Sequence, residues 1–135
     1  MLTAADLKSA QDIVYAAMQP TPQYCWPLLC KRLAAEVWVK HENHTPIGAF
    51  KVRGGFVHMR RRKERGETGG VISATRGNHG QSIATAGKRE GIPVTIVVPL
   101  GNSREKNDAM PAQGAQLIEY GRAFEEAAAH AQRLA

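Results

Sequence analysis

The chain contains only two cysteines among its 135 residues, and it has no group of histidine and cysteine side chains that would complete a zinc site. Cys25 and Cys30 stand five positions apart, which is neither a metal-ligand spacing nor that of a redox pair. Two cysteines in a chain of this size indicate reduced thiols in a cytosolic protein. The sequence therefore predicts no metal site.

Long apolar runs are also missing. The longest, residues 94–100, includes Pro99 and is far too short to cross a bilayer. The N-terminus lacks a basic region followed by an apolar run, so we expect no signal peptide. These absences predict a soluble, cytoplasmic protein without a membrane partner.

Three glycine motifs of common enzyme classes are absent. Gly77 and Gly80 do not form the G-x-G-x-x-G of dinucleotide-binding folds, and no G-K-[ST] triplet supplies a phosphate loop. No G-x-S-x-G elbow of a serine hydrolase is present. A dinucleotide-binding fold thus stays as an alternative that no motif supports.

Basic residues exceed acidic ones, 18 against 12, and much of the excess lies in the run from Arg60 to Arg65. This run falls at the end of an expected helix, where cations complement the helix dipole. No aromatic residue interrupts it, so a platform for stacking bases is not expected. We interpret the run as a solvated helix end. A basic nucleic-acid-binding protein stays as an alternative that predicts salt-sensitive binding.

The first third of the chain has an irregular pattern. Thr3 and Asp6 predict a capping box that opens a helix to about residue 18, and Pro20 and Pro22 follow it. Residues 24–30 are ambiguous, and Pro27 argues against a central strand. We expect a short helix over residues 28–35 and a strand over residues 36–40.

From residue 51 the pattern becomes regular. Helices are expected over residues 51–67, 78–90 and 122–134, with a further helix that Asn102 and Glu105 cap and that Pro111 and Gly114 end. Strands are expected over residues 71–74, 94–98 and 116–119. Such alternation predicts an α/β fold with an open parallel sheet and helices on both faces. Three strands make a small sheet, so the domain is either marginal or part of a longer chain.

Lys51 is the main candidate for a reactive side chain. It follows a turn, stands at the start of an expected helix and is preceded by Phe50. A helix N-terminus disfavours a second positive charge, and partial desolvation beside Phe50 acts in the same direction. Both effects favour a neutral amine that attacks carbonyls. The alternative is an ordinary surface lysine.

The loop of residues 73–82 is the second candidate, because it follows a strand at the edge where open α/β sheets bind ligands. Gly77 permits close approach of the backbone, and the first amides of the next helix form an anion site. Asn78 and His79 add side chains that hydrogen-bond an oxygen or a carboxylate. The alternative is an N-cap at Asn78 and a surface His79.

Six segments together carry a family resemblance: residues 40–43 (KHEN), 48–54 (GAFKVRG), 76–81 (RGNHGQ), 91–99 (GIPVTIVVP), 105–106 (EK) and 114–115 (GA). In order and spacing they resemble the signatures of pyridoxal-phosphate enzymes of the threonine/serine dehydratase family, which has the tryptophan synthase beta-like fold (fold type II). Cysteine synthase-type relatives usually show Lys-Asp-Arg where this chain has Lys51-Val52-Arg53. The resemblance therefore favours the dehydratase group.

The resemblance implies a role for each candidate. Lys51 would hold pyridoxal 5'-phosphate covalently and act as the acid/base group, with Phe50 packed beside the cofactor. Asn78 would hydrogen-bond the ring hydroxyl oxygen. The substrate carboxylate would be held by Thr75, Gly77 and His79. The implied reaction converts a hydroxy-amino acid such as L-threonine or L-serine to a 2-oxo acid and ammonia.

Three positions depart from the family pattern. Ile47 and Ala49 stand where Thr and Ser are frequent, and Arg76 stands where a small residue is usual. A serine at the Arg76 position supplies a proton in serine racemase-like relatives, so its absence argues against racemisation. Arg76 could instead attract an acidic group of the substrate, the alternative being a solvent-facing loop arginine.

The chain is much shorter than the two-domain family fold. We expect residues 1–50 to be the start of the larger cofactor domain and residues 51–135 to be most of the small domain. The glycine-rich phosphate cup of the C-terminal half would be absent, so we expect weak cofactor binding and little turnover. Alternatives are a non-catalytic fragment or binding module, or another fold type II enzyme of β-elimination or β-replacement. Leu7, Val14, Val37 and Val39 are expected to be exposed and to favour homo-oligomers.

Overall fold

The computed structural model describes all 135 residues of the chain. Its C-terminal part contains a parallel sheet of order β3-β4-β5, formed by β3 (Val71–Ala74), β4 (Val94–Val98) and β5 (Gln116–Glu119). α4 (Asn78–Glu90) connects the first two strands and α5 (Arg104–Ala112) connects the last two. The predicted open parallel sheet is confirmed, with these strands at the expected residues.

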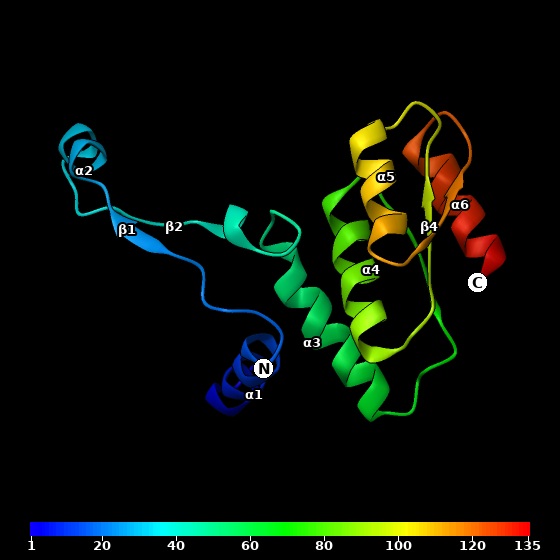
Figure 1. The fold of residues 1–135 in the computed structure, drawn as a ribbon, viewed down its shortest axis with the longest axis horizontal. Coiled ribbons are helices and arrows are strands. Elements are labelled where there is room, and N and C mark those ends of the chain that lie inside the picture. Colours follow the sequence, from blue (N-terminus) through cyan, green and yellow to red (C-terminus); the bar gives the residue numbers. More distant parts are fainter.

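Helices cover both faces of this sheet (Figure 1). α4 and α5 pack on one face, and α3 (Lys51–Glu64) packs against α4 as a further layer. α6 (Phe124–Leu134) lies alone on the opposite face, against β3 and β4. The two-sided covering that the alternating pattern predicts is therefore present.

The central strand β4 is buried on both faces because it lies between two cores. Ile96 and Val98 join the larger apolar cluster with Val52 of α3, whereas Val97 packs against α6 through Ala127. This alternation follows from the period-two geometry of a strand. The continuous apolar run that the sequence shows at β4 is thus explained by burial from both sides.

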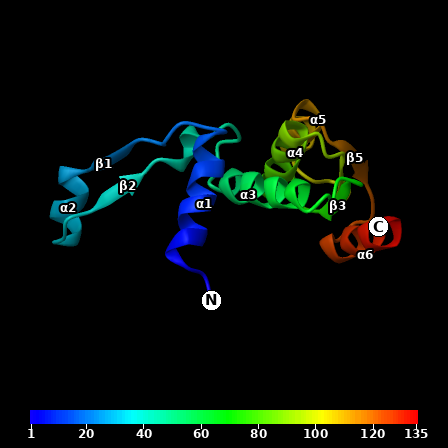
Figure 2. The same cartoon turned by 90° about the horizontal axis from the view of Figure 1, so that it is seen from below.

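The N-terminal third is an arm and a helix outside the sheet. α1 (Ala4–Tyr15) begins with the predicted capping box, in which the side chains and backbone of Thr3 and Asp6 bond reciprocally, and it packs against α3. The arm consists of the antiparallel strands β1 (Gln23–Cys25) and β2 (Trp38–Lys40), with α2 (Pro27–Leu33) between them. Both views show this arm extending away from the body (Figures 1 and 2). A 3₁₀ turn, η1 (Glu42–His44), leads back toward α3.

Several predicted boundaries are wrong by a few residues. α1 ends at Tyr15 rather than near residue 18, α3 ends at Glu64 rather than 67, and β2 begins only at Trp38. β1 falls within a segment that the sequence left ambiguous. Pro27 is the first residue of α2, where a missing N–H is not needed. No helix of the chain combines the length and apolar character that crossing a membrane requires.

Two predicted helix starts also differ. Ser103, not Asn102, precedes α5, and the Asn102 side-chain amide instead donates to Asn107 Oδ1 at 2.7 Å. α6 begins at Phe124 rather than Arg122, because Glu126 accepts from the Arg122 and Ala123 N–H groups and so bonds the turn before the helix.

The expected exposure of four apolar side chains is only partly right. Leu7 is 72% exposed, but Val14 is buried in the main core beside α3. Val37 and Val39 are half-buried in the arm. The prediction for Val14 was wrong because α1 turns this residue toward α3.

Candidate functional site

The loop between β3 and α4 lies at the carboxyl ends of the parallel strands, as predicted. Thr75 is buried and its N–H donates to the Val97 carbonyl at 3.0 Å, which extends the β3–β4 pairing. Its hydroxyl oxygen accepts from the Gly77 N–H at 3.1 Å. The loop is therefore held in one conformation by the neighbouring strand and by its own threonine.

Gly77 brings the loop backbone close to the Lys106 side chain of α5. A Cβ on this residue would lie 2.6 Å from Lys106 Cδ and 3.3 Å from Lys106 Nζ. The Lys106 side chain of α5 thus extends over the loop and places an ammonium group beside it. Lys106 was not predicted as a site residue, because no local pattern links α5 to this loop.

The start of α4 has no side-chain cap. Gly77 occupies the N-cap position, and Asn78 is the exposed first residue of the helix without a capping hydrogen bond. The alternative that Asn78 serves as the N-cap is therefore wrong. The first amides of α4 have no acceptor within the helix and are available to an anion.

Lys51 is the first residue of α3 and lies close to the start of α4. The Ser82 hydroxyl of α4 donates to the Lys51 carbonyl at 2.7 Å. A Cβ on Gly55 would lie only 2.3 Å from Ser82 Oγ, so the glycine allows α3 and α4 to approach. This contact sets the position of Lys51 relative to the loop.

A cavity of about 660 Å³ lies between α3, β3 and α4. Phe50, Lys51 and His79 all line it, and Ser73 and Ser82 add hydroxyl groups. Neither serine was predicted as a site residue. Ser82 had a usable signal, because it stands three positions after His79 and shares its helix face.

The expected desolvation of Lys51 is wrong. The Lys51 side chain is exposed, and Phe50 is 63% exposed. The amine forms no ion pair with a carboxylate. Its position at the helix N-terminus is as predicted.

His79 is exposed and lines the same cavity as Lys51. Partial desolvation, followed by the positive charges of Lys51 and His58, holds the pKa of His79 below its usual value of 6.5. The imidazole is therefore mostly neutral at pH 7. A neutral ring adds no further positive charge beside the Lys51 amine.

Arg76 lies on the other side of the loop. Together with Thr75 and His79 it lines a second hollow of about 530 Å³, which Phe124 and Glu125 of α6 complete. The guanidinium carbon lies 5.8 Å from the centre of the Phe124 ring, and Arg76 forms no ion pair. His79 lines both spaces and so connects them.

The structure thus brings Phe50, Lys51 and His79 to one cavity and places Thr75 beside His79 in the adjoining hollow. Asn78 and Gly77 line neither space, although both belong to the loop and helix start between them. The predicted residues therefore lie around the loop between β3 and α4, some in the cavity beside α3 and others in the hollow beside α6.

A half-buried ionic network holds the turn before Lys51. Arg53 Nε donates to Glu42 Oε2 at 2.7 Å and Arg53 Nη2 donates to Glu42 Oε1 at 2.9 Å. The Thr21 hydroxyl donates to Glu42 Oε1 at 2.6 Å. Next along the chain, Thr45 Oγ1 bonds both the N–H and the carbonyl of Ala49 at 2.9 Å. These bonds join the arm, the turn and α3.

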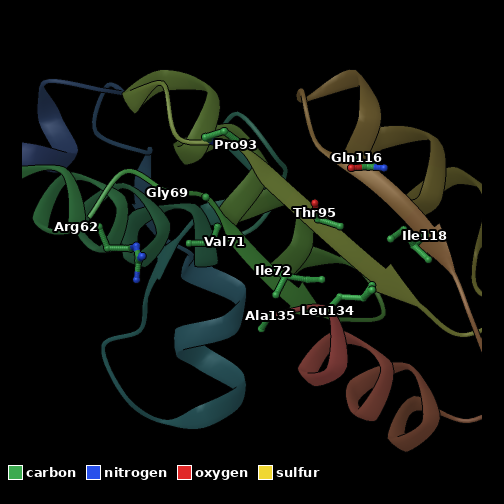
Figure 3. Close-up of a pocket in the computed structure, with 11 residues that line it drawn as sticks. Arg62, Gly69, Val71, Ile72, Pro93, Thr95, Gln116, Ile118, Leu134 and Ala135 are labelled. Atoms are coloured by element: carbon green, nitrogen blue, oxygen red, sulfur yellow. The ribbon is translucent and has the colours of Figure 1, made fainter. Parts of the chain in front are cut away.

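Another hollow, of about 610 Å³, lies at the amino ends of the strands, away from the loop (Figure 3). Its lining comes from strand starts, glycines and the end of α6, and Arg62 is its only charged side chain. None of the predicted site residues is there. This hollow offers no set of groups for catalysis.

Comparison with known proteins identifies relatives over nearly all of the chain. The profile of the family described as "Pyridoxal-phosphate dependent enzyme" matches residues 14–135. The biosynthetic L-threonine dehydratase IlvA of Haemophilus influenzae is 35% identical over 118 residues, which cover 87% of this chain and 23% of that protein. The L-threo-3-hydroxyaspartate ammonia-lyase of Saccharomyces cerevisiae is 33% identical, covering 92% of this chain and 38% of that protein.

Among solved structures, a pyridoxal 5'-phosphate-dependent aspartate racemase superposes with a TM-score of 0.90 at 29% identity. The superposition covers 98% of this chain and 42% of the racemase. The chain therefore spans less than half the length of each of these proteins.

Proposed function

The chain belongs to the family of pyridoxal-phosphate dependent enzymes, and on that premise we propose that it is the N-terminal part of an ammonia-lyase. The substrate would be a hydroxy-amino acid such as L-threonine or L-serine, and the products a 2-oxo acid and ammonia. The observation that carries the proposal is the unpaired amine of Lys51, which shares a cavity with His79 at the uncapped start of α4. The L-threonine dehydratase of Haemophilus influenzae supports the substrate class.

The residues present fit pyridoxal 5'-phosphate, the cofactor of this family. Lys51 has a free amine at a cavity wall, which is what covalent attachment to an aldehyde requires. Phe50 offers a ring beside it, and the exposed amide of Asn78 would hydrogen-bond the ring hydroxyl oxygen. When bound, the cofactor supplies an electron sink for the pair released at the substrate Cα.

The remaining residues would hold and orient the substrate. The Thr75 oxygen accepts from Gly77, which leaves the Thr75 O–H free to donate to a carboxylate. The first amides of α4 have no acceptor within the helix, and the His79 ring would donate a further hydrogen bond to the carboxylate. Lys51 would remove the α-proton, because its amine lines the cavity and carries no carboxylate partner.

Activity of the whole polypeptide that carries this segment tests the proposal. We expect release of a 2-oxo acid from L-threonine or L-serine, and we expect Lys51→Ala to abolish it. Lys63→Ala is the matched control, because Lys63 lies at the far end of the same helix. Full activity of Lys51→Ala would refute the assignment. No turnover by the wild-type polypeptide, with cofactor still attached at Lys51, would favour the alternative of a non-catalytic binding module.

Arg76 favours a second candidate substrate, an amino dicarboxylate such as a hydroxyaspartate. Its guanidinium has no carboxylate partner and lies in the hollow that Thr75 and His79 share. The yeast relative is named for hydroxyaspartate and the structural neighbour for aspartate. The NMR signals of the His79 ring would report the binding of added malonate, a dicarboxylate, and of acetate, a monocarboxylate. We expect the chain to bind malonate more tightly than acetate, and we expect Arg76→Ala to remove this difference. An unchanged preference would exclude this role.

A further inference from the structure

Two thiols meet in the arm. Cys25 is the last residue of β1, and Cys30 lies in α2 just after the turn through Trp26. Their sulfur atoms are 3.4 Å apart. Their separation of five positions is no reason to pair them, because the contact depends on the direction in which α2 leaves the strand.

The surroundings of the pair favour reaction at Cys30. The Val37 N–H donates to Cys30 Sγ at 3.2 Å and so holds this sulfur in place beside Cys25. Both cysteines are only half-buried, so a small reagent has access to them. Hydrogen bonding between the sulfur atoms raises the pKa of Cys25, which lowers the share of its nucleophilic thiolate.

We propose that Cys25 and Cys30 form a redox-active dithiol that closes to an intramolecular disulfide on exchange with a low-molecular-weight disulfide such as oxidised glutathione. The Cys30 thiolate attacks one glutathione sulfur, and the first glutathione leaves as a thiolate. The Cys25 thiolate then attacks the Cys30 sulfur and releases the second glutathione. The protein gives up two electrons and two protons, and one glutathione disulfide becomes two glutathione molecules.

Closure requires little movement. The sulfur atoms must approach from 3.4 Å to the bonded distance of about 2.05 Å. The product ties α2 to β1. This matters for α2, because none of its seven residues is buried and only local contacts hold it.

The test compares the folded and the unfolded chain. The 135-residue chain is equilibrated with mixtures of reduced and oxidised glutathione, quenched with acid and analysed by mass spectrometry. We expect the native chain to lose the mass of two hydrogen atoms without keeping a glutathione adduct. At the same glutathione ratio, the disulfide-to-dithiol ratio should be roughly tenfold higher in the native chain than in the chain unfolded by urea.

Single substitutions show whether the two sulfurs act together. Cys25→Ser and Cys30→Ser each remove one partner, and each should accumulate the glutathione adduct that the wild-type chain resolves. Circular dichroism checks that both variants fold. As an independent readout, trypsin cleavage after Lys31 and Arg32 in α2 should be roughly tenfold slower in the oxidised chain than in the reduced chain.

The possible results separate clearly. A native chain that keeps glutathione on one cysteine, or that forms disulfide no more readily than the urea-unfolded chain, would overturn the proposal. Disulfide-linked dimers as the main product would also overturn it.

Discussion

Replacing Glu42 by glutamine should destabilise the chain at neutral pH. It should also abolish the loss of stability that protonation of the Glu42 carboxylate causes in acid. Glu42 accepts two hydrogen bonds from Arg53 and one from the buried Thr21. The Glu42 and Arg53 side chains are only 21% and 23% exposed, so water screens the pair incompletely. The network fixes the arm on α3 two residues from Lys51.

The magnitude follows from the pKa of Glu42. Hydrogen bonds from Arg53, then from Thr21, and the charges of Arg53 and Lys40 outweigh the opposing effect of burial, and they lower this pKa from 4.5 to about 2. The difference corresponds to about 3 kcal/mol of stability. Because the folded pKa lies below the unfolded one, this stability is complete above pH 4.5 and is lost as pH falls through about 2. About half of it remains at pH 3.

Urea unfolding followed by circular dichroism at pH 7 and at pH 3 measures this effect. We expect Glu42→Gln to cost about 3 kcal/mol at pH 7 and about half of that at pH 3. Asp108→Asn is the matched control, because its ion pair with Arg104 is exposed and should contribute less than about 1 kcal/mol. The reasoning fails if Glu42→Gln has the same cost at both pH values, or if Asp108→Asn costs as much.

Four further outcomes are expected. In an NMR titration the His79 ring should titrate below 6.5, and Lys51→Met should raise its midpoint by removing a nearby charge; an unchanged midpoint would count against the shared cavity. Gly55→Ala should destabilise the chain by about 1–3 kcal/mol through Ser82, whereas Gly54→Ala, whose Cβ meets nothing within 4 Å, should not. Sedimentation should show self-association that Leu7→Gln weakens, and a clean monomer would contradict this. The 135-residue chain alone should bind pyridoxal phosphate weakly and turn over little, and turnover like that of full-length relatives would refute this.

The sequence predicted the sheet and its helices well, because their signals are local. β4 is an apolar run between turn residues, and α4 lies between Gly77 and Gly91, so residues 78–90 and 94–98 were located without error. The alternation predicted that the strands are parallel, whereas their order is known from the structure.

Features that depend on tertiary contacts were missed. Lys106 reaches the loop only because α5 packs beside α4, and β1 exists only through its pairing with β2. The exposure of Lys51 and the contact of Cys25 with Cys30 depend on where helices point after a turn. Helix and strand propensities and residue spacing contain no information about the direction of a helix after a turn.

The central claim is that the Lys51 amine attaches pyridoxal phosphate. Incubating the chain with the cofactor, reducing with borohydride and mapping the modified peptides tests it directly, since every lysine competes in one experiment. The account predicts label concentrated on the peptide that contains Lys51 and lost in Lys51→Ala. Label spread evenly over surface lysines such as Lys8, Lys63 and Lys88, with no preference for Lys51, would contradict it.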